Sequence, residues 1–162
     1  MGRIIVRASS TSKASPEAIY PLLKDSSTYP VWGMVGGYEM ERPGRNEPHG
    51  LGEIRILRTW PFTAREEMVE FIPNRKVSYV LLSGFPMLNY RGETTLTPLP
   101  GGGTRIDWVS SFDPKYRSTG WFWRRFMTWV LTNMVRDLAA GAEDGVIARL
   151  ATLSRPLNAP SA

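Results

Sequence analysis

The sequence contains no cysteine and only one histidine, His49, among its 162 residues. Without cysteine the chain has no disulfide, no thiolate nucleophile and no sulfur ligands for zinc or an iron–sulfur cluster. A single histidine excludes the multi-histidine cages that bind many metals. We therefore expect no metal site and no cofactor. The absence of cysteine also agrees with a cytoplasmic location, which is our expectation.

Long apolar runs are also missing. At the N-terminus, Arg3 and Arg7 interrupt the segment before the apolar core of a signal peptide could form. In the aromatic C-terminal region, the longest uncharged stretch runs from Phe126 to Val135 and has ten residues, against about 20 for a membrane span. We expect neither a targeting signal nor a membrane-spanning helix.

Acidic residues are in the minority, because 20 lysines and arginines face 15 aspartates and glutamates. The basic residues are scattered singly along the chain, and the densest pair is Arg124-Arg125. A nucleic-acid-binding surface needs cations gathered on one face, so we predict no nucleic-acid partner.

The length and the 42% hydrophobic content are typical of one folded domain. We place this domain at residues 1–154. Residues 155–162 hold two prolines and small polar side chains, which predict a flexible tail.

The N-terminal part of the chain predicts one strand and two short helices. Residues 3–12 carry β-branched apolar side chains and then serines and threonines, as in a strand. Ser15-Pro16-Glu17 is a typical helix start, so residues 16–24 should form a short helix. Pro30 and Gly33 punctuate a second helical segment over residues 26–32.

Between Tyr38 and Phe112, regularly spaced proline and glycine turns separate six runs of strand length. Residues 89–97 and 104–112 both alternate, which places Tyr90 and Trp108 on inward positions. The glycines 101–103 lack the lysine of a phosphate loop and should form the hairpin turn between these strands.

Residues 120–153 predict one long helix, because the strand period vanishes and no proline follows until Pro156. Its apolar stripe includes Met127 and Met134. Small residues gather at positions 139–148, among them Gly141 and Gly145. They either leave space for a cavity or allow close contact between helix and sheet.

One strand, two short helices, six antiparallel strands and a long helix form an α+β arrangement in which the helix covers a curved sheet. This order resembles the helix-grip fold of the START and birch-pollen-allergen (SRPBCC) superfamily, and within it the polyketide cyclase/dehydrase family. The segments that carry the resemblance are residues 15–20, 29–32, 71–75, 90–99 and 102–108.

The resemblance implies a curved seven-stranded antiparallel sheet wrapped around the C-terminal helix, with a mostly apolar cavity between them. Relatives use such a cavity for lipids, hormones, polyketides or quinones. We therefore expect a non-catalytic binder or carrier of a hydrophobic small molecule, such as a lipid, isoprenoid or polyketide. The predicted cavity lining consists of Trp32, Tyr79, Tyr90, Trp108, Met127 and Met134.

Charged residues at 65–67 lie within the predicted strand 62–71. If Ala64 and Met68 face inward, Glu66 enters the cavity and becomes a ligand-binding residue. If the opposite face is inward, Arg65 and Glu67 enter instead. The third alternative is a bulge or an exposed strand end that leaves all three outside.

Two further functions remain open. The first is a polyketide aromatase/cyclase-dehydratase, which needs at least two titratable groups converging in the cavity. No spacing identifies such groups, and His49 lies in a predicted surface turn, so the catalytic residues are unknown. The second is an interaction module of the quinone-chaperone type, which uses the aromatic segment 121–129. For that segment, we rank a homodimer contact and the mouth of the pocket above a membrane anchor.

Overall fold

The computed structural model describes residues 2–145. The predicted tail, residues 155–162, and the predicted helical residues 146–153 lie outside the described residues.

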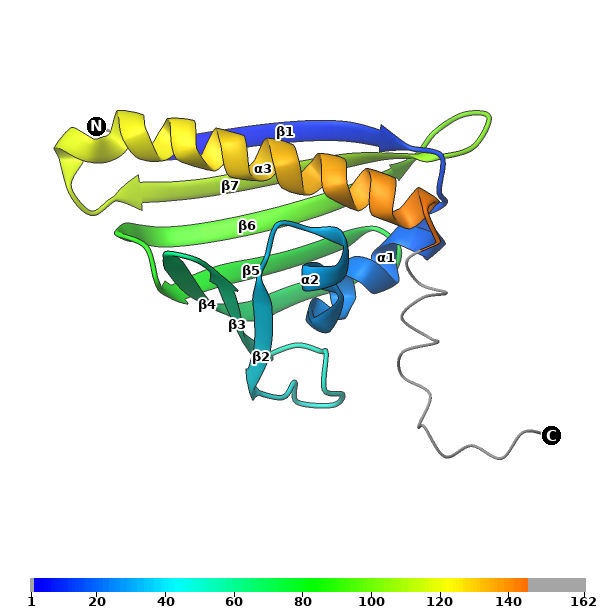
Figure 1. Ribbon diagram of the computed structural model, residues 1–162, viewed down its shortest axis with the longest axis horizontal. Coiled ribbons are helices and arrows are strands. Elements are labelled where there is room, and N and C mark those ends of the chain that lie inside the picture. The colour runs from blue at the N-terminus through cyan, green and yellow to red at the C-terminus, as the bar shows by residue number, and fades with distance from the viewer. Residues whose placement is uncertain (1, 146–162) are drawn as a thin grey trace.

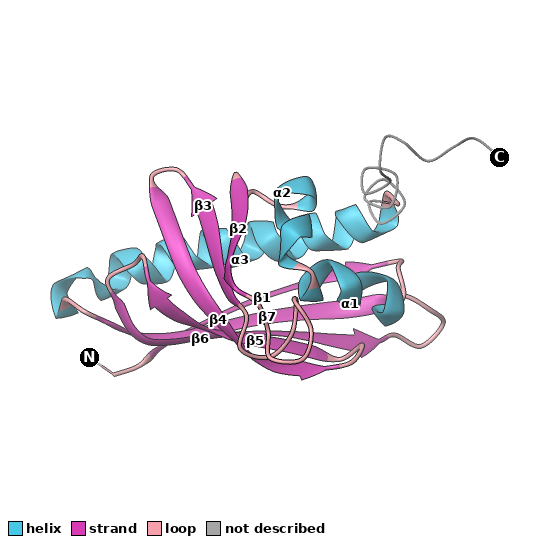
Figure 2. Ribbon diagram, turned by 90° about the horizontal axis from the view of Figure 1, so that it is seen from below, coloured by secondary structure: helices cyan, strands magenta, loops and turns pink. Residues whose placement is uncertain are grey.

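Seven strands form one antiparallel sheet in the order β1-β7-β6-β5-β4-β3-β2. The sheet curves, and the long helix α3 runs along its concave face (Figures 1 and 2). The fold predicted from the order of elements is therefore confirmed. The elements are β1 (Ile4–Ser12), α1 (Pro16–Lys24), η1 (Ser26–Thr28), α2 (Tyr29–Trp32), β2 (Gly37–Arg42), β3 (Ile54–Thr59), β4 (Phe62–Ile72), β5 (Lys76–Ser83), β6 (Met87–Pro98), β7 (Thr104–Pro114), η2 (Arg117–Thr119) and α3 (Gly120–Glu143).

The short helix α1 has the bounds predicted from its start signal. The Ser15 hydroxyl accepts a hydrogen bond from the Ala18 backbone N–H, and Pro16 occupies the first turn, where a missing N–H does no harm. The second helical segment is a 3₁₀ turn followed by the single turn of α2. Together they place the residues before β2 beside the concave face of the sheet.

Strands β6 and β7 pair as the alternation predicted, with Thr94 opposite Trp108 and Leu96 opposite Ile106. Gly101, Gly102 and Gly103 all have positive φ, between 85° and 106°. Side chains other than glycine rarely adopt this conformation, so the three glycines form the turn. The register places Tyr90 and Trp108 in the buried interior.

Helix α3 ends earlier than its sequence predicted. It has 24 residues and stops at Glu143, which corresponds to about 36 Å. Gly145 has a φ of 68°, the left-handed conformation that commonly closes a helix. The sequence prediction placed the helix end too late because it relied on the next proline as the stop signal, whereas a glycine in this conformation also ends a helix.

The small residues of α3 allow close packing against β1. The Ser12 hydroxyl donates a 2.8 Å hydrogen bond to the backbone carbonyl of Ala139. Gly141 is buried, whereas Gly145 is exposed, and neither lines the cavity described below. For the small residues within α3, close contact between helix and sheet is the interpretation that the structure supports, and residues 146–148 lie outside the described residues.

Candidate functional site

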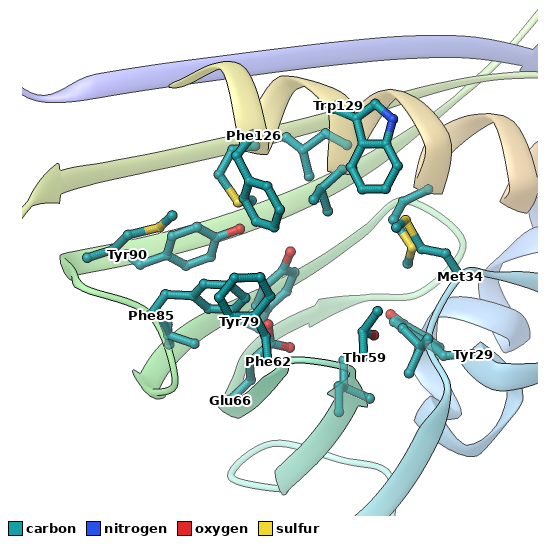
Figure 3. A pocket seen from close by; sticks show the side chains of 18 of the residues that line it. Tyr29, Met34, Thr59, Phe62, Glu66, Tyr79, Phe85, Tyr90, Phe126 and Trp129 are labelled. Atoms are coloured by element: carbon teal, nitrogen blue, oxygen red, sulfur yellow. The ribbon is translucent and has the colours of Figure 1, made fainter. Parts of the chain in front are cut away.

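A cavity of about 250 Å³ lies between the concave face of the sheet and α3 (Figure 3). The walls come from the α2–β2 segment, strands β3 to β7 and α3, and most of the lining is apolar. The polar lining side chains are Tyr29, Arg55, Thr59, Glu66, Tyr79, Tyr90 and Trp108.

Six of the seven residues expected at the ligand-binding site line this cavity. Their side chains come from β4, β5, β6, β7 and α3. They are Glu66, Tyr79, Tyr90, Trp108, Met127 and Met134.

Trp32 is not among the lining residues. It is buried in the core, where its ring packs against Tyr29 with ring centroids 4.8 Å apart. Its indole Nε1 donates a 2.9 Å hydrogen bond to the Thr28 hydroxyl. The orientation of the short helix α2 places Tyr29 on the cavity side and Trp32 behind it.

Strand β4 turns Glu66 toward the cavity. Ala64, Glu66 and Met68 are buried, which is the first of the three arrangements expected for this strand. Arg65 and Glu67 lie on the outer face, where they pair with Glu41 and Arg42. The pairing of β4 with β5 does contain register shifts, yet these leave Glu66 inside.

Sequence reasoning missed the partner of Glu66. Arg55 on β3 lies directly opposite Glu66 in the sheet and is only 1% exposed. Its Nε donates to Glu66 Oε2 at 2.8 Å, and a second guanidinium nitrogen lies 2.7 Å from the same oxygen. A third nitrogen donates to the Ser26 hydroxyl at 3.0 Å.

Two aromatic rings enclose the Arg55 guanidinium. Its central carbon lies 4.7 Å from the ring centroid of Tyr29 and 4.8 Å from that of Tyr79. Burial lowers the pKa of Arg55, but the interactions with Tyr29 and Glu66 outweigh it and raise the pKa above its ordinary value. Arg55 is therefore a permanent cation, held by one carboxylate and two aromatic faces.

The tyrosines beside this ion pair stay protonated at neutral pH. Trp108 Nε1 donates a 3.1 Å hydrogen bond to the Tyr79 hydroxyl, and the Tyr90 hydroxyl lies 2.7 Å from the Ser110 hydroxyl. Burial raises the pKa of Tyr79 well above its usual value and that of Tyr90 to about 12. Both hydroxyls are thus neutral groups on an otherwise apolar wall.

Aromatic side chains surround the remaining boundary of the cavity. Phe62, Phe85 and Phe126 pack together, with ring centroids 4.8 to 6.1 Å apart. Beside them, Trp60 at the β3–β4 turn is 94% exposed and Trp129 on α3 is 55% exposed. Both tryptophans line the cavity as well as contacting solvent, so they mark its mouth.

His49 lies away from the cavity, in the loop between β2 and β3. Its two ring nitrogens are each 3.2 Å from a carboxylate, one of Asp25 and one of the fully buried Glu53. The Tyr38 hydroxyl donates to the same Glu53 oxygen at 2.8 Å. The loop is therefore anchored by a polar cluster, where sequence analysis expected only a surface turn.

Within residues 2–145, no group of acidic or histidine side chains is placed to hold a metal ion. None of the helices in this part of the chain is long and apolar enough to cross a membrane.

A curved antiparallel sheet closed over a long helix, with an apolar cavity between them, defines a helix-grip protein. The sequence profile of the family described as polyketide cyclase / dehydrase and lipid transport matches residues 3–143. The chain therefore belongs to that family, and the resemblance inferred from the sequence is confirmed. No curated protein matches the chain.

Solved structures show the same fold at low sequence identity. A START superfamily protein from Mycobacterium smegmatis is 16% identical with a TM-score of 0.75, and the match covers 88% of this chain and 99% of that one. An uncharacterised protein from Bacillus thuringiensis is also 16% identical, with a TM-score of 0.73 and coverages of 87% and 100%.

An enzyme also shares the fold. A norcoclaurine synthase point mutant from Thalictrum flavum, in complex with a transition-state analogue, is 12% identical with a TM-score of 0.71. That match covers 88% of this chain and 96% of the synthase. The helix-grip fold thus accommodates catalysis in one protein, and at this identity the likeness concerns the fold alone.

Proposed function

We propose that this protein binds a small, mostly apolar molecule in the cavity and acts as a binder or carrier rather than as an enzyme. The observation that carries the proposal is the cavity itself, about 250 Å³ of space with a mostly apolar wall and a few polar groups at one end. Ligand pockets have this composition, because apolar burial supplies affinity and a few polar groups orient the ligand.

The proposal is tested by filling the cavity. Leu81 on β5 lines it, and the next residue, Leu82, points outward and is 41% exposed. In Leu81→Trp, the indole occupies ligand space, so we expect the affinity for the neutral apolar probe N-phenyl-1-naphthylamine to fall about tenfold or more. The readout is probe fluorescence during titration.

Leu82→Trp is the matched control, since it adds the same side chain to the outer face of the same strand. We expect it to bind the probe like the parent protein. Equal binding by both variants, with circular dichroism showing both to be folded, would count against the cavity as the binding site.

The alternative is a cyclase-dehydratase, and one of its requirements is met because Glu66 converges with Tyr79 and Tyr90. Proton transfer is efficient when the pKa of the catalytic group lies near the working pH. The pKa of Tyr90 is raised to about 12 and that of Tyr79 also rises, while Glu66 is held by Arg55. The two tyrosines therefore favour hydrogen bonding to a ligand over proton exchange with it.

A second candidate function is contact with an anionic membrane surface, which the cavity mouth favours. We define the aromatic face as Trp60, Trp121, Phe122 and Trp129, all of them exposed. Residues 114–136 hold five exposed cations and no acidic residue. The cations are Lys115, Arg117, Arg124, Arg125 and Arg136.

The positive charge around the aromatic face distinguishes between two partners, a second copy of the chain and an anionic membrane. In a two-fold symmetric dimer the same patch meets itself, so clustered cations oppose each other. An anionic lipid surface attracts the cations, and tryptophan side chains favour the membrane interface. We therefore favour a membrane containing acidic phospholipids over a second copy of the chain.

We expect the protein to float with vesicles of phosphatidylglycerol and phosphatidylcholine, and to be released by salt. At 3.6 residues per turn, Arg125 and Arg136 lie on the side of α3 that carries Trp129. The double variant Arg125→Glu/Arg136→Glu should weaken vesicle binding about tenfold or more.

The control is Arg7→Glu/Arg75→Glu, which makes the same change in net charge at two exposed positions outside the helix. If it loses as much vesicle binding as the first double variant, overall charge rather than this face is responsible. A concentration-dependent dimer in sedimentation that Trp129→Ser abolishes would favour the homodimer instead.

A further inference from the structure

We infer that the polar end of the cavity selects a neutral molecule carrying a hydroxyl group, such as a phenol or alcohol, and rejects carboxylates. This inference rests on the proposed function and assigns the chemical class of the ligand. It follows from the way Arg55 and Glu66 share their hydrogen bonds.

The first step concerns charge. The Arg55 guanidinium and the Glu66 carboxylate lie 2.7 Å apart and neutralise each other. Both side chains line the cavity and both are buried, Arg55 being 1% and Glu66 8% exposed. A negatively charged ligand would therefore lose its hydration inside an apolar wall and find no free positive charge there, because the Arg55 cation is already paired with the Glu66 carboxylate.

The second step concerns hydrogen-bonding capacity. Both Arg55 contacts go to Glu66 Oε2, and Oε1 has no hydrogen-bond partner among residues 2–145. In this part of the chain, Glu53 Oε2 is the one fully buried side-chain oxygen that lacks a hydrogen-bond partner. Glu66 Oε1 also lacks a partner, and it is therefore not fully buried. Glu66 lines the cavity together with Tyr79 (Figure 3), so a ligand can donate a hydrogen bond to this unpaired oxygen.

The third step concerns cations. An ammonium group would also donate to Glu66 Oε1, but it would lose its hydration inside an apolar wall. It would gain no net attraction from a carboxylate that Arg55 already neutralises. A neutral hydroxyl avoids both penalties, and the hydroxyl of Tyr79 offers it a second partner.

The test compares three naphthalenes of nearly equal shape at neutral pH, each competing with N-phenyl-1-naphthylamine. They are 2-naphthol, which donates a hydrogen bond; 2-methoxynaphthalene, which does not; and 2-naphthoate, which is an anion. A hydrogen bond to a charged group predicts that 2-naphthol binds about tenfold or more tightly than the ether. We expect 2-naphthoate to bind more weakly than either.

The variant Glu66→Gln separates recognition from packing. It keeps the shape of the side chain and leaves Arg55 as an unpaired cation, so the preference should reverse, with 2-naphthoate gaining about tenfold or more in affinity. A merely structural role for Glu66 would weaken all three ligands together. If Glu66→Gln does not fold, the order of the affinities of the three compounds for the unchanged protein still tests the inference.

The outcomes are distinguishable from those of the proposed function. Equal binding of 2-naphthol and its methyl ether, or preferred binding of 2-naphthoate by the unchanged protein, overturns this inference and leaves the cavity as a binding site. Failure of all three compounds and of N-phenyl-1-naphthylamine to bind overturns the proposed function itself.

Discussion

Replacing Arg55 with methionine should lower the free energy of unfolding by about 3–5 kcal/mol, because it leaves the Glu66 carboxylate buried without its counter-charge. The Ser26 hydroxyl would also lose its donor, and Tyr29 and Tyr79 would lose the cation between their rings. Denaturant unfolding followed by circular dichroism measures the change.

Two comparisons determine whether the missing counter-charge is the cause. The double variant Arg55→Met/Glu66→Met removes both charges and should recover most of the loss, since an apolar pair of similar volume packs without an unpaired ion. The neighbouring surface pair Arg58–Glu39, with side chains 51% and 54% exposed, is the control. Breaking it with Arg58→Met should cost less than about 1 kcal/mol. Equal losses at Arg55 and Arg58 would contradict the prediction.

Adding one methyl group at Gly92 should destabilise the protein by about 1–3 kcal/mol and disrupt the cavity wall. Gly92 on β6 lies directly opposite Tyr79 on β5, and the Tyr79 ring covers it. A Cβ at position 92 would lie 2.7 Å from Tyr79 Cε1. Gly92→Ala therefore displaces the ring and disturbs its contacts with Arg55 and the Trp108 indole.

The prediction is tested as a double-mutant cycle by denaturant unfolding. In the Tyr79→Leu background the ring is absent, so Gly92→Ala should have little effect. Gly37→Ala is the matched control in another strand, because its Cβ would approach no atom closer than 3.9 Å. Additive effects of Gly92→Ala and Tyr79→Leu would show that the ring is not what Gly92 accommodates.

Arg55, the partner of Glu66 that sequence reasoning missed, could have been found by counting residues across the β3–β4 turn. Strands β3 and β4 are joined by Trp60 and Pro61 alone, so Thr59 faces Phe62. Four residues further from the turn on each strand, Arg55 faces Glu66. An arginine opposite a glutamate is a recognisable cross-strand pair, and it also determines which face of β4 turns inward.

Other features could not be found in this way. Trp32 and Tyr29 are three residues apart on a single helical turn, and only the packing of that turn against the sheet decides that Tyr29 borders the cavity. In the sequence, the small residues of α3 indicated that space is left free where the helix meets the sheet. The hydrogen bond from Ser12 to the Ala139 carbonyl shows that β1 occupies it.

Local sequence patterns determined the order of the elements, the start of α1, the β6–β7 hairpin and the helix-grip fold. Each depends on alternation, turn glycines or caps within a few residues, which act before any distant contact forms. Only the tertiary structure decided the cavity's boundaries and its polar end. Arg55, Glu66, Tyr79 and Tyr29 come from four elements, and their charges and rings meet only when the sheet curves around α3.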